Sequence, residues 1–202
     1  MIKLYDMERS GNCYKARLML SLLGVAYDKV LVDLSKGQQK EPGYLAVNPV
    51  GQVPTLDDNG TVIRDSGAIL VYLGAKYGKG SWYPASPEAM GHIQQWLAYV
   101  SNEVFHGLAV TRAIKIGIRQ GDYEAAKANG LKALGVFEAG LTGKSWLVGN
   151  GPTVADIASY SYIAMSPQAG IPHDAFPAIA AWCKRIEALP GYVTPPKPPV
   201  AS

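Results

Sequence analysis

Residues 10–15, SGNCYK, could handle a thiol. They have the spacing of a redox C-x-x-C motif that opens a helix, but Ser10 stands in place of the first cysteine. A serine hydroxyl can donate a hydrogen bond to sulfur, and the N-terminus of a helix favours a thiolate. Three interpretations are open: disulfide exchange through Cys13, activation of the thiol of a bound molecule, or a plain N-cap.

A proline follows Val53 in residues 48–56, NPVGQVPTL. Pro54 has no N–H for a strand ladder, so the backbone of Val53 is left to pair with an extended peptide. In thioredoxin-like folds a cis proline before the third strand has this role. We therefore interpret Val53-Pro54 as a peptide-docking element with a cis bond, against the alternative of a turn with an edge proline.

Asp65 and Ser66 lie where a strand gives way to a helix in residues 64–70, RDSGAIL. Ser66 can cap this helix and leave its N–H groups free to bind a carboxylate. Asp65 beside it can receive an ammonium group. A carboxylate and an ammonium on one α-carbon are what the γ-glutamyl end of glutathione presents, whereas a helix cap alone is the alternative for Ser66.

The elements that must position these residues follow from the patterning of the chain. We expect a strand at 2–6, a helix at 10–24, a strand at 26–34, a loop with one short helix, a hairpin at 53–65 and a helix at 66–78. This order is that of a thioredoxin-like α/β domain.

The rest of the chain is predicted to be helical. Gly, Ser and Pro interrupt every pattern near residues 79–87, which indicates a linker. Helices are expected at 88–118, 122–141, 153–168 and 176–191, and the proline-rich tail from 192 is expected to be an extended surface end. We therefore predict a thioredoxin-like domain at 1–78, a linker at 79–87 and an all-helical domain at 88–202.

Composition is that of an ordinary globular protein, with 202 residues, 48% hydrophobic and 17% charged. The net charge of +3, without a basic block, argues against a nucleic-acid partner. No apolar run suggests a membrane span, and no signal peptide is evident. Cys13 and Cys183 are far apart and form no disulfide framework, so we expect the cytoplasm.

Taken together, these motifs resemble the cytosolic glutathione S-transferases over the whole chain. The resemblance lies in SGNCYKARL, NPVGQVPTL and DSGAILVYL, and in GPTVADIASYSY of the second half. In that last stretch Thr153 and Asp156 have the spacing of a helix capping box, which is structural. The closest likeness is to serine-type, theta- or beta-like members of bacteria.

The resemblance implies that Ser10 activates the thiol of glutathione. Ser10 matches the catalytic serine of theta-like members, where beta- and omega-like members have a cysteine. Asn12 stands where theta-like members commonly have proline, and its amide is a second candidate donor. Cys13 is interpreted as a buried packing residue. Tyr5 is rejected as the tyrosine of alpha-, mu- and pi-like members, because it lies inside the first strand.

Glutathione is the co-substrate that the resemblance implies, and no metal is expected. Gln39 and Lys40, with Lys36 as an alternative, are candidates for its glycine carboxylate, although a solvated basic loop is equally open for the lysines. Gln52 is a candidate for the γ-glutamyl end. The predicted glutathione site in one subunit is Gln39, Lys40, Gln52, Val53, Pro54, Asp65 and Ser66.

An electrophile pocket is expected between the domains. One wall is the loop after the first strand, with Met7, Glu8 and Arg9. The other is a helix face with α-helical spacing, formed by Tyr99, Asn102, Glu103, His106 and Val110. His106 is either catalytic or an ordinary interdomain residue, and Asn102 or Glu103 could reach glutathione bound to the partner subunit of a homodimer.

These inferences lead to a homodimeric transferase that joins glutathione sulfur to a hydrophobic, small-molecule electrophile. A glutathione-dependent disulfide reductase or peroxidase is the first alternative, and the missing cysteine at position 10 argues against it. A non-catalytic binding module of the same fold, an isomerase and a dehalogenase also stay open. The sequence does not identify the electrophile.

Overall fold

A four-stranded mixed sheet forms the first part of the molecule, in a computed structural model that describes residues 1–198. The strand order is β2-β1-β3-β4, with β2 parallel to β1 and the other pairs antiparallel. The strands are β1 (Ile2–Asp6), β2 (Tyr27–Leu31), β3 (Thr55–Asp58) and β4 (Thr61–Arg64). The βαβ and ββα units confirm the predicted thioredoxin-like α/β fold.

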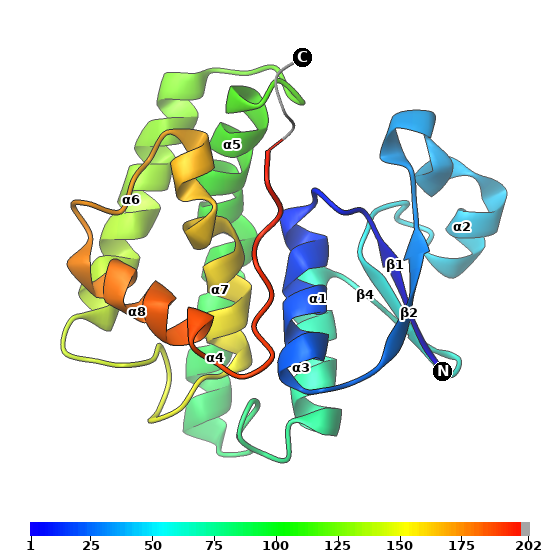
Figure 1. The fold of residues 1–202 in the computed structure, drawn as a ribbon, viewed down its shortest axis with the longest axis horizontal. Coiled ribbons are helices and arrows are strands. Elements are labelled where there is room, and N and C mark those ends of the chain that lie inside the picture. The colour runs from blue at the N-terminus through cyan, green and yellow to red at the C-terminus, as the bar shows by residue number, and fades with distance from the viewer. Residues whose placement is uncertain (199–202) are drawn as a thin grey trace.

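Two helices, α1 (Gly11–Leu22) and α3 (Ser66–Tyr77), cover the side of the sheet that faces the helical part (Figure 1). The connection from β2 contains two short 3₁₀ turns, η1 (Leu34–Lys36) and η2 (Gln38–Lys40), and the helix α2 (Pro42–Val47), which lies at the outer edge of the molecule. The predicted loop with a short helix is thus a run of three helical turns.

The second part is all helical, as predicted. Its elements are α4 (Pro87–Tyr99), η3 (Val100–Ala109), α5 (Val110–Lys115), α6 (Tyr123–Leu141), α7 (Val154–Ala164), η4 (Ser166–Ala169) and α8 (Pro177–Glu187). The long helix expected over 88–118 is continuous from α4 to α5, but its central segment η3 is a π-helix. Gly107 of η3 packs directly on Gly130 of α6, where an added Cβ would come within 2.7 Å of the Gly130 backbone.

Helix α7 is the centre of the core, and its residues 154–163 are all buried. The capping box predicted from Thr153 and Asp156 is present at its N-terminus. Asp156 also accepts hydrogen bonds from the Leu147 N–H at 3.0 Å and from Trp182 Nε1 at 2.9 Å. One buried carboxylate therefore joins α7, α8 and the loop between α6 and α7.

The chain after α8 has no helix through residue 198, as the prolines predicted. It runs along α1 beside the helical part (Figure 1). Tyr14 donates its hydroxyl proton to the Val193 carbonyl at 2.6 Å, and Ser21 donates to the Gly191 carbonyl at 2.6 Å. The rest of the predicted extended end, 199–202, lies outside the described residues.

Replacing Asp156 by Asn should lower the free energy of unfolding by about 3 kcal/mol, because an amide cannot accept from all the donors that surround this carboxylate. Urea unfolding measures this loss. Asp122→Asn is the matched control, since Asp122 caps α6 through one exposed hydrogen bond and asparagine caps equally well. Equal losses in the two variants would contradict the assigned role.

Candidate active site

Ser10 caps α1. Its backbone is extended, and its Oγ accepts a hydrogen bond from the Cys13 N–H at 3.2 Å. This bond uses a lone pair of the oxygen and leaves the hydroxyl proton free to be donated elsewhere. The N-cap interpretation and the thiol-donor interpretation of Ser10 are therefore compatible with each other.

Cys13 is fully buried, as predicted for a packing residue. Its Sγ accepts from the Met7 N–H at 3.4 Å. Burial raises the pKa of the Cys13 thiol to about 12, although the nearby Ser10 side chain and the hydrogen bond from the Met7 N–H each lower it in part. A buried thiol with this pKa is neither accessible nor ionised at neutral pH, which removes the disulfide-exchange interpretation.

A small polar pocket of about 160 Å³ lies beside the N-terminal turn of α1. It brings together six of the predicted residues from three separate segments: Asn12, Gln52, Val53, Pro54, Asp65 and Ser66. Asn48, Val50 and Arg64 also line it and were not predicted. Arg64 stands next to Asp65 in the sequence, and a charged residue beside a predicted site residue was the signal that could have identified it.

The loop before β3 is held in place by two buried polar side chains. Tyr44 and Asn48 both donate to the Gln52 carbonyl, at 2.5 and 2.8 Å, and both contact Thr55 Oγ1 at 2.9 Å. The Val53-Pro54 peptide bond that follows is cis, as predicted. Strand pairing begins at Thr55, so Val53 lies outside the ladder, and it lines the small pocket.

Asp65, and not Ser66, is the N-cap of α3, which corrects the predicted cap. Its Oδ1 accepts from the N–H groups of Gly67 at 2.8 Å and Ala68 at 3.0 Å. Its backbone has φ of 72°, a left-handed value that is uncommon for a residue other than glycine. Ser66 is buried and is the first residue of the helix. Asp65 lines the small pocket, and within residues 1–198 its Oδ2 makes no hydrogen bond.

Lys15, one turn into α1, is a buried cation that the sequence reasoning missed. Its Nζ lies 5.2 Å from the centre of the Tyr162 ring, and Tyr162 lines the larger cavity described next. Burial lowers the pKa of Lys15 to about 8, while the negative charge of Asp65 opposes the shift. A positive charge is thus held behind the N-terminus of α1, where it adds to the helix dipole.

A larger cavity of about 640 Å³ lies between the two parts of the molecule. Four predicted residues line it: Met7, Arg9 and Val110 of the electrophile pocket, and the catalytic candidate Ser10. The other lining residues are Gly11, Asp33, Leu34, Ser35, Phe105, Ala109, Arg112, Ala113, Ile116, Ile118, Arg119 and Tyr162. Its walls are mainly apolar on the side of η3 and α5.

Tyr99 and His106 do not line this cavity, contrary to expectation. Tyr99 packs edge-on against Trp96 and Phe137, whereas His106 is exposed beside Phe105. The α-helical spacing failed here because η3 is a π-helix, whose hydrogen bonds join residues five apart. Phe105 and Val110, which are five apart, share the face that borders the cavity.

The remaining predicted residues lie apart from both spaces. Asn102 and Glu103 are exposed and hydrogen-bonded to each other at 3.0 Å. Gln39 and Lys40 lie on η2, and Lys40 Nζ donates to the Val50 carbonyl at 3.3 Å. These two residues therefore pack against the rim of the small pocket but do not line it.

No group of three or more His, Cys, Asp or Glu residues within 1–198 is arranged to hold a metal ion. Within the same range, no helix is both long enough and apolar enough to span a membrane.

Two family models match the chain. The glutathione S-transferase N-terminal domain matches residues 4–82, and the glutathione S-transferase C-terminal domain matches residues 89–190. A maize relative, glutathione S-transferase 3, is 30% identical over 100% of this chain and 98% of its own length.

Solved structures are similar over nearly the whole chain. A glutathione S-transferase of Pseudomonas fluorescens is 34% identical with a TM-score of 0.89, over 96% of this chain and 98% of its own. A glutathione transferase homologue of Drosophila mojavensis, solved with bound glutathione, is 28% identical with a TM-score of 0.85, over 94% of this chain and 88% of its own.

Replacing Lys15 by Met should change how stability depends on pH. A lysine with a folded pKa near 8 and an ordinary pKa of 10.5 binds fewer protons in the folded than in the unfolded chain between these values. The wild type should therefore gain stability relative to the variant as pH rises from 8 to 10.5, by up to about 3 kcal/mol. Urea unfolding of both proteins at pH 7 and pH 10 measures the gain, and a constant difference would contradict it.

Proposed function

This chain belongs to the glutathione S-transferase family and is an enzyme of glutathione conjugation, and we propose that it joins the sulfur of glutathione to hydrophobic electrophiles in a detoxification reaction. One observation carries the proposal: the N-terminal turn of α1 borders both spaces. Ser10 lines the large apolar cavity, and Asn12 lines the small polar pocket. A tripeptide bound in the small pocket would therefore present its cysteine where the large cavity begins.

The small pocket has the groups that a γ-glutamyl end requires. Asp65 Oδ2 receives the ammonium in this proposal, and the N–H and hydroxyl of Ser66 bind the carboxylate, because the N–H groups of Gly67 and Ala68 already donate to Asp65 Oδ1. Arg64 and Gln52 are further polar partners at this end. The backbone of Val53 pairs with the cysteinyl unit of glutathione, and Pro54 holds Val53 in position.

The other end of glutathione lies toward η2 in this proposal. Lys40, whose ammonium group already lies at the rim of the small pocket, attracts the glycine carboxylate, and Gln39 is next to it.

Activation of the thiol needs only a modest stabilisation of charge. A free thiol has a pKa of about 8.5, so only a small fraction of it is thiolate at neutral pH. Ser10 donates its hydroxyl proton as a hydrogen bond to the sulfur, and the dipole of α1 and the charge of Lys15 lower the thiol pKa further. The thiol proton leaves to solvent. The thiolate then attacks carbon, forming the C–S bond as the leaving group departs with its electron pair.

The alternatives are less well supported. A disulfide reductase or peroxidase of this fold needs an exposed thiol, but position 10 is serine and Cys13 is buried. The serine at position 10 supports a theta-like member, and the similarity to the Pseudomonas fluorescens enzyme supports a bacterial one. The free thiols of Cys13 and Cys183 support a cytoplasmic location. A solved relative with bound glutathione and an intact polar pocket speak against a non-catalytic module.

A homodimer is part of the proposal. Three apolar side chains, Val50, Val62 and Met90, are exposed on the loop before β3, on β4 and on α4. A second copy that covers them would leave Asn102 and Glu103 able to reach glutathione in the partner subunit. Sedimentation should give twice the chain mass of 21.6 kDa, and Val62→Asp with Met90→Lys should reduce it to one chain.

Replacing Ser10 by Ala should raise the pKa of bound glutathione, because its sulfur loses a hydrogen-bond donor. The ultraviolet thiolate band of the binary complex should titrate at higher pH, and turnover of a chromogenic aryl halide should fall by about tenfold to a hundredfold. Asn12→Ala is the partner variant, since the amide is the second candidate donor.

Asp65→Ala is the matched contrast. It should weaken glutathione binding, measured by calorimetry, because the ammonium loses its counter-charge, while the thiol of the bound fraction titrates as in wild type. A titration that moves only in Asn12→Ala would assign the donor role to Asn12 and leave Ser10 as a cap. A titration unchanged in both variants would overturn the proposed site.

A further inference from the structure

The larger cavity is cationic as well as apolar. Arg9, Arg112 and Arg119 line it, and Asp33 is the one acidic residue among its lining side chains within 1–198. Asp33 is already engaged by its own loop: Oδ1 accepts from the N–H and hydroxyl of Ser35, and Oδ2 lies 3.7 Å from Lys36 Nζ. A hydrophobic, uncharged electrophile would use none of this positive charge.

Arg112 is the unusual member of the three. Arg9 and Arg119 are exposed and share their charge with water, whereas Arg112 on α5 is only 4% exposed. It makes no ion pair with an acid in residues 1–198, and its Nη2 is buried there without a hydrogen-bond partner. A buried guanidinium that lacks an anion is costly, so a structure that retains it gains from binding one.

The orientation of Arg112 is set from behind. Its Nε donates to Gln168 Oε1 at 2.7 Å, and Gln168 Nε2 in turn donates to the Pro196 carbonyl at 2.9 Å. The segment after α8 thus holds Gln168, and Gln168 holds one edge of the guanidinium. Arg112 lines the cavity, and its guanidinium has the planar fork of N–H donors that suits an oxyanion.

From this arrangement we propose that the electrophiles of this enzyme carry an acidic group, a carboxylate or sulfonate, which Arg112 binds while the apolar body lies against Phe105, Ala109 and Ile116. The inference rests on the proposed function, since the same cavity must hold the carbon that the thiolate attacks. Ser10 and Arg112 both line this space, so one molecule can meet the thiolate at one end and the guanidinium at the other.

A matched pair of aryl halides tests the proposal: 4-chloro-3-nitrobenzoate and its neutral isostere 4-chloro-3-nitrobenzamide. In each, the thiolate of glutathione forms a C–S bond at the ring carbon and chloride leaves with its electron pair. Each kcat/KM is divided by the uncatalysed rate, because the two rings differ in reactivity. The wild type should prefer the benzoate by at least about tenfold.

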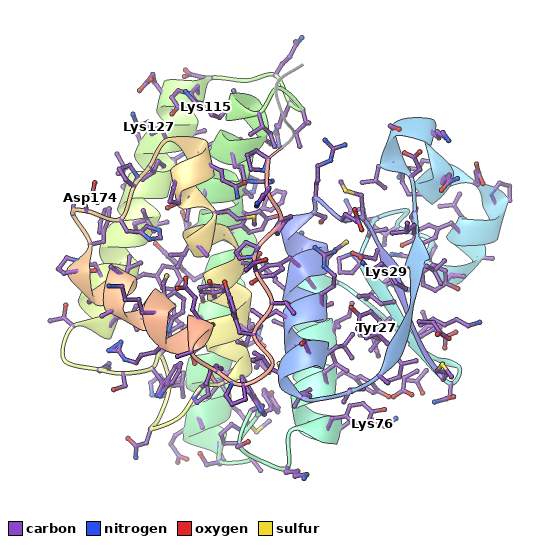
Figure 2. All side chains as sticks on the ribbon, viewed as in Figure 1. Tyr27, Lys29, Lys76, Lys115, Lys127 and Asp174 are labelled. Atoms are coloured by element: carbon purple, nitrogen blue, oxygen red, sulfur yellow. The ribbon has the colours of Figure 1, made fainter. Side chains whose placement is uncertain are left out.

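Arg112→Gln should lower this corrected preference by about tenfold to a hundredfold, and Arg112→Lys should keep part of it. Lys115→Gln is the control, because it removes the same charge from the same helix outside the cavity. Lys115 lies near Lys127 on the helical part, both over the Tyr123 ring (Figure 2). It should leave the preference within about twofold.

Three results would overturn the inference: no preference in wild type, a preference that survives Arg112→Gln, or one lost instead in Arg119→Gln. Binding of the two aryl glutathione conjugates to wild type, measured by calorimetry, does not depend on turnover or on the folding of a variant. Tighter binding of the carboxylate conjugate supports the inference even if neither halide is turned over. The absence of turnover would then contradict the proposed function but not the inference. Equal binding of the conjugates contradicts the inference.

Discussion

The contact between the first turn of α1 and α7 is the constraint on which the site depends. Ser161 of α7 donates to the Gly11 carbonyl at 2.7 Å, and a Cβ at Gly11 would come within 2.6 Å of the Tyr162 ring. Only glycine allows this approach. Because the two parts of the molecule meet at that turn, Ser10 lies on the interdomain cavity while Asn12 lies on the small pocket. A larger residue at position 11 would force the first turn of α1 away from α7 and so change both spaces.

Two buried positive charges that form no ion pair within residues 1–198 lie near this turn. Lys15 lies on α1 with its ammonium over the Tyr162 ring, and Arg112 lines the larger cavity. The positive end of the α1 dipole is at the same turn. Burial lowers the pKa of both side chains, which records the cost of holding their charge away from water. A thiolate placed at the N-terminus of α1 would reduce that cost. The pocket is therefore prepared for negative charge before any ligand arrives, as expected for a site that stabilises an anion.

The cavity wall depends on the π-helix in the middle of the long helical segment. The wider turn of η3 moves Tyr99 into the packing against α6 and brings Phe105 and Val110 to the cavity. Arg112 follows on α5, where Gln168 and the chain after α8 hold its guanidinium. If Arg112 selects the electrophile as proposed, that choice depends on the packing of the C-terminal segment, which is distant in sequence from the proposed glutathione site.

Local sequence determined much of this protein. The strand and helix patterns, the turn signals, the Val53-Pro54 step and the Thr153–Asp156 capping spacing each act over a few residues, so they could be interpreted without the fold. The same was true of Cys13, whose place among apolar helical neighbours predicted burial. The lining of the small pocket was largely predicted as well, since Val53, Pro54, Asp65 and Ser66 occupy short motifs at the ends of strands and starts of helices.

Tertiary structure decided what depends on contacts between distant segments. The left-handed backbone of Asp65 at the strand end decided that Asp65, and not Ser66, caps α3. The π-helical turn of η3 decided which side chains of the long helix face the cavity. The buried cations Lys15 and Arg112 gave no local signal, because a lysine or arginine in an amphipathic helix is ordinarily exposed. Only the packing of α7, η4 and the C-terminal segment around these two side chains excludes the water that would otherwise screen their charges.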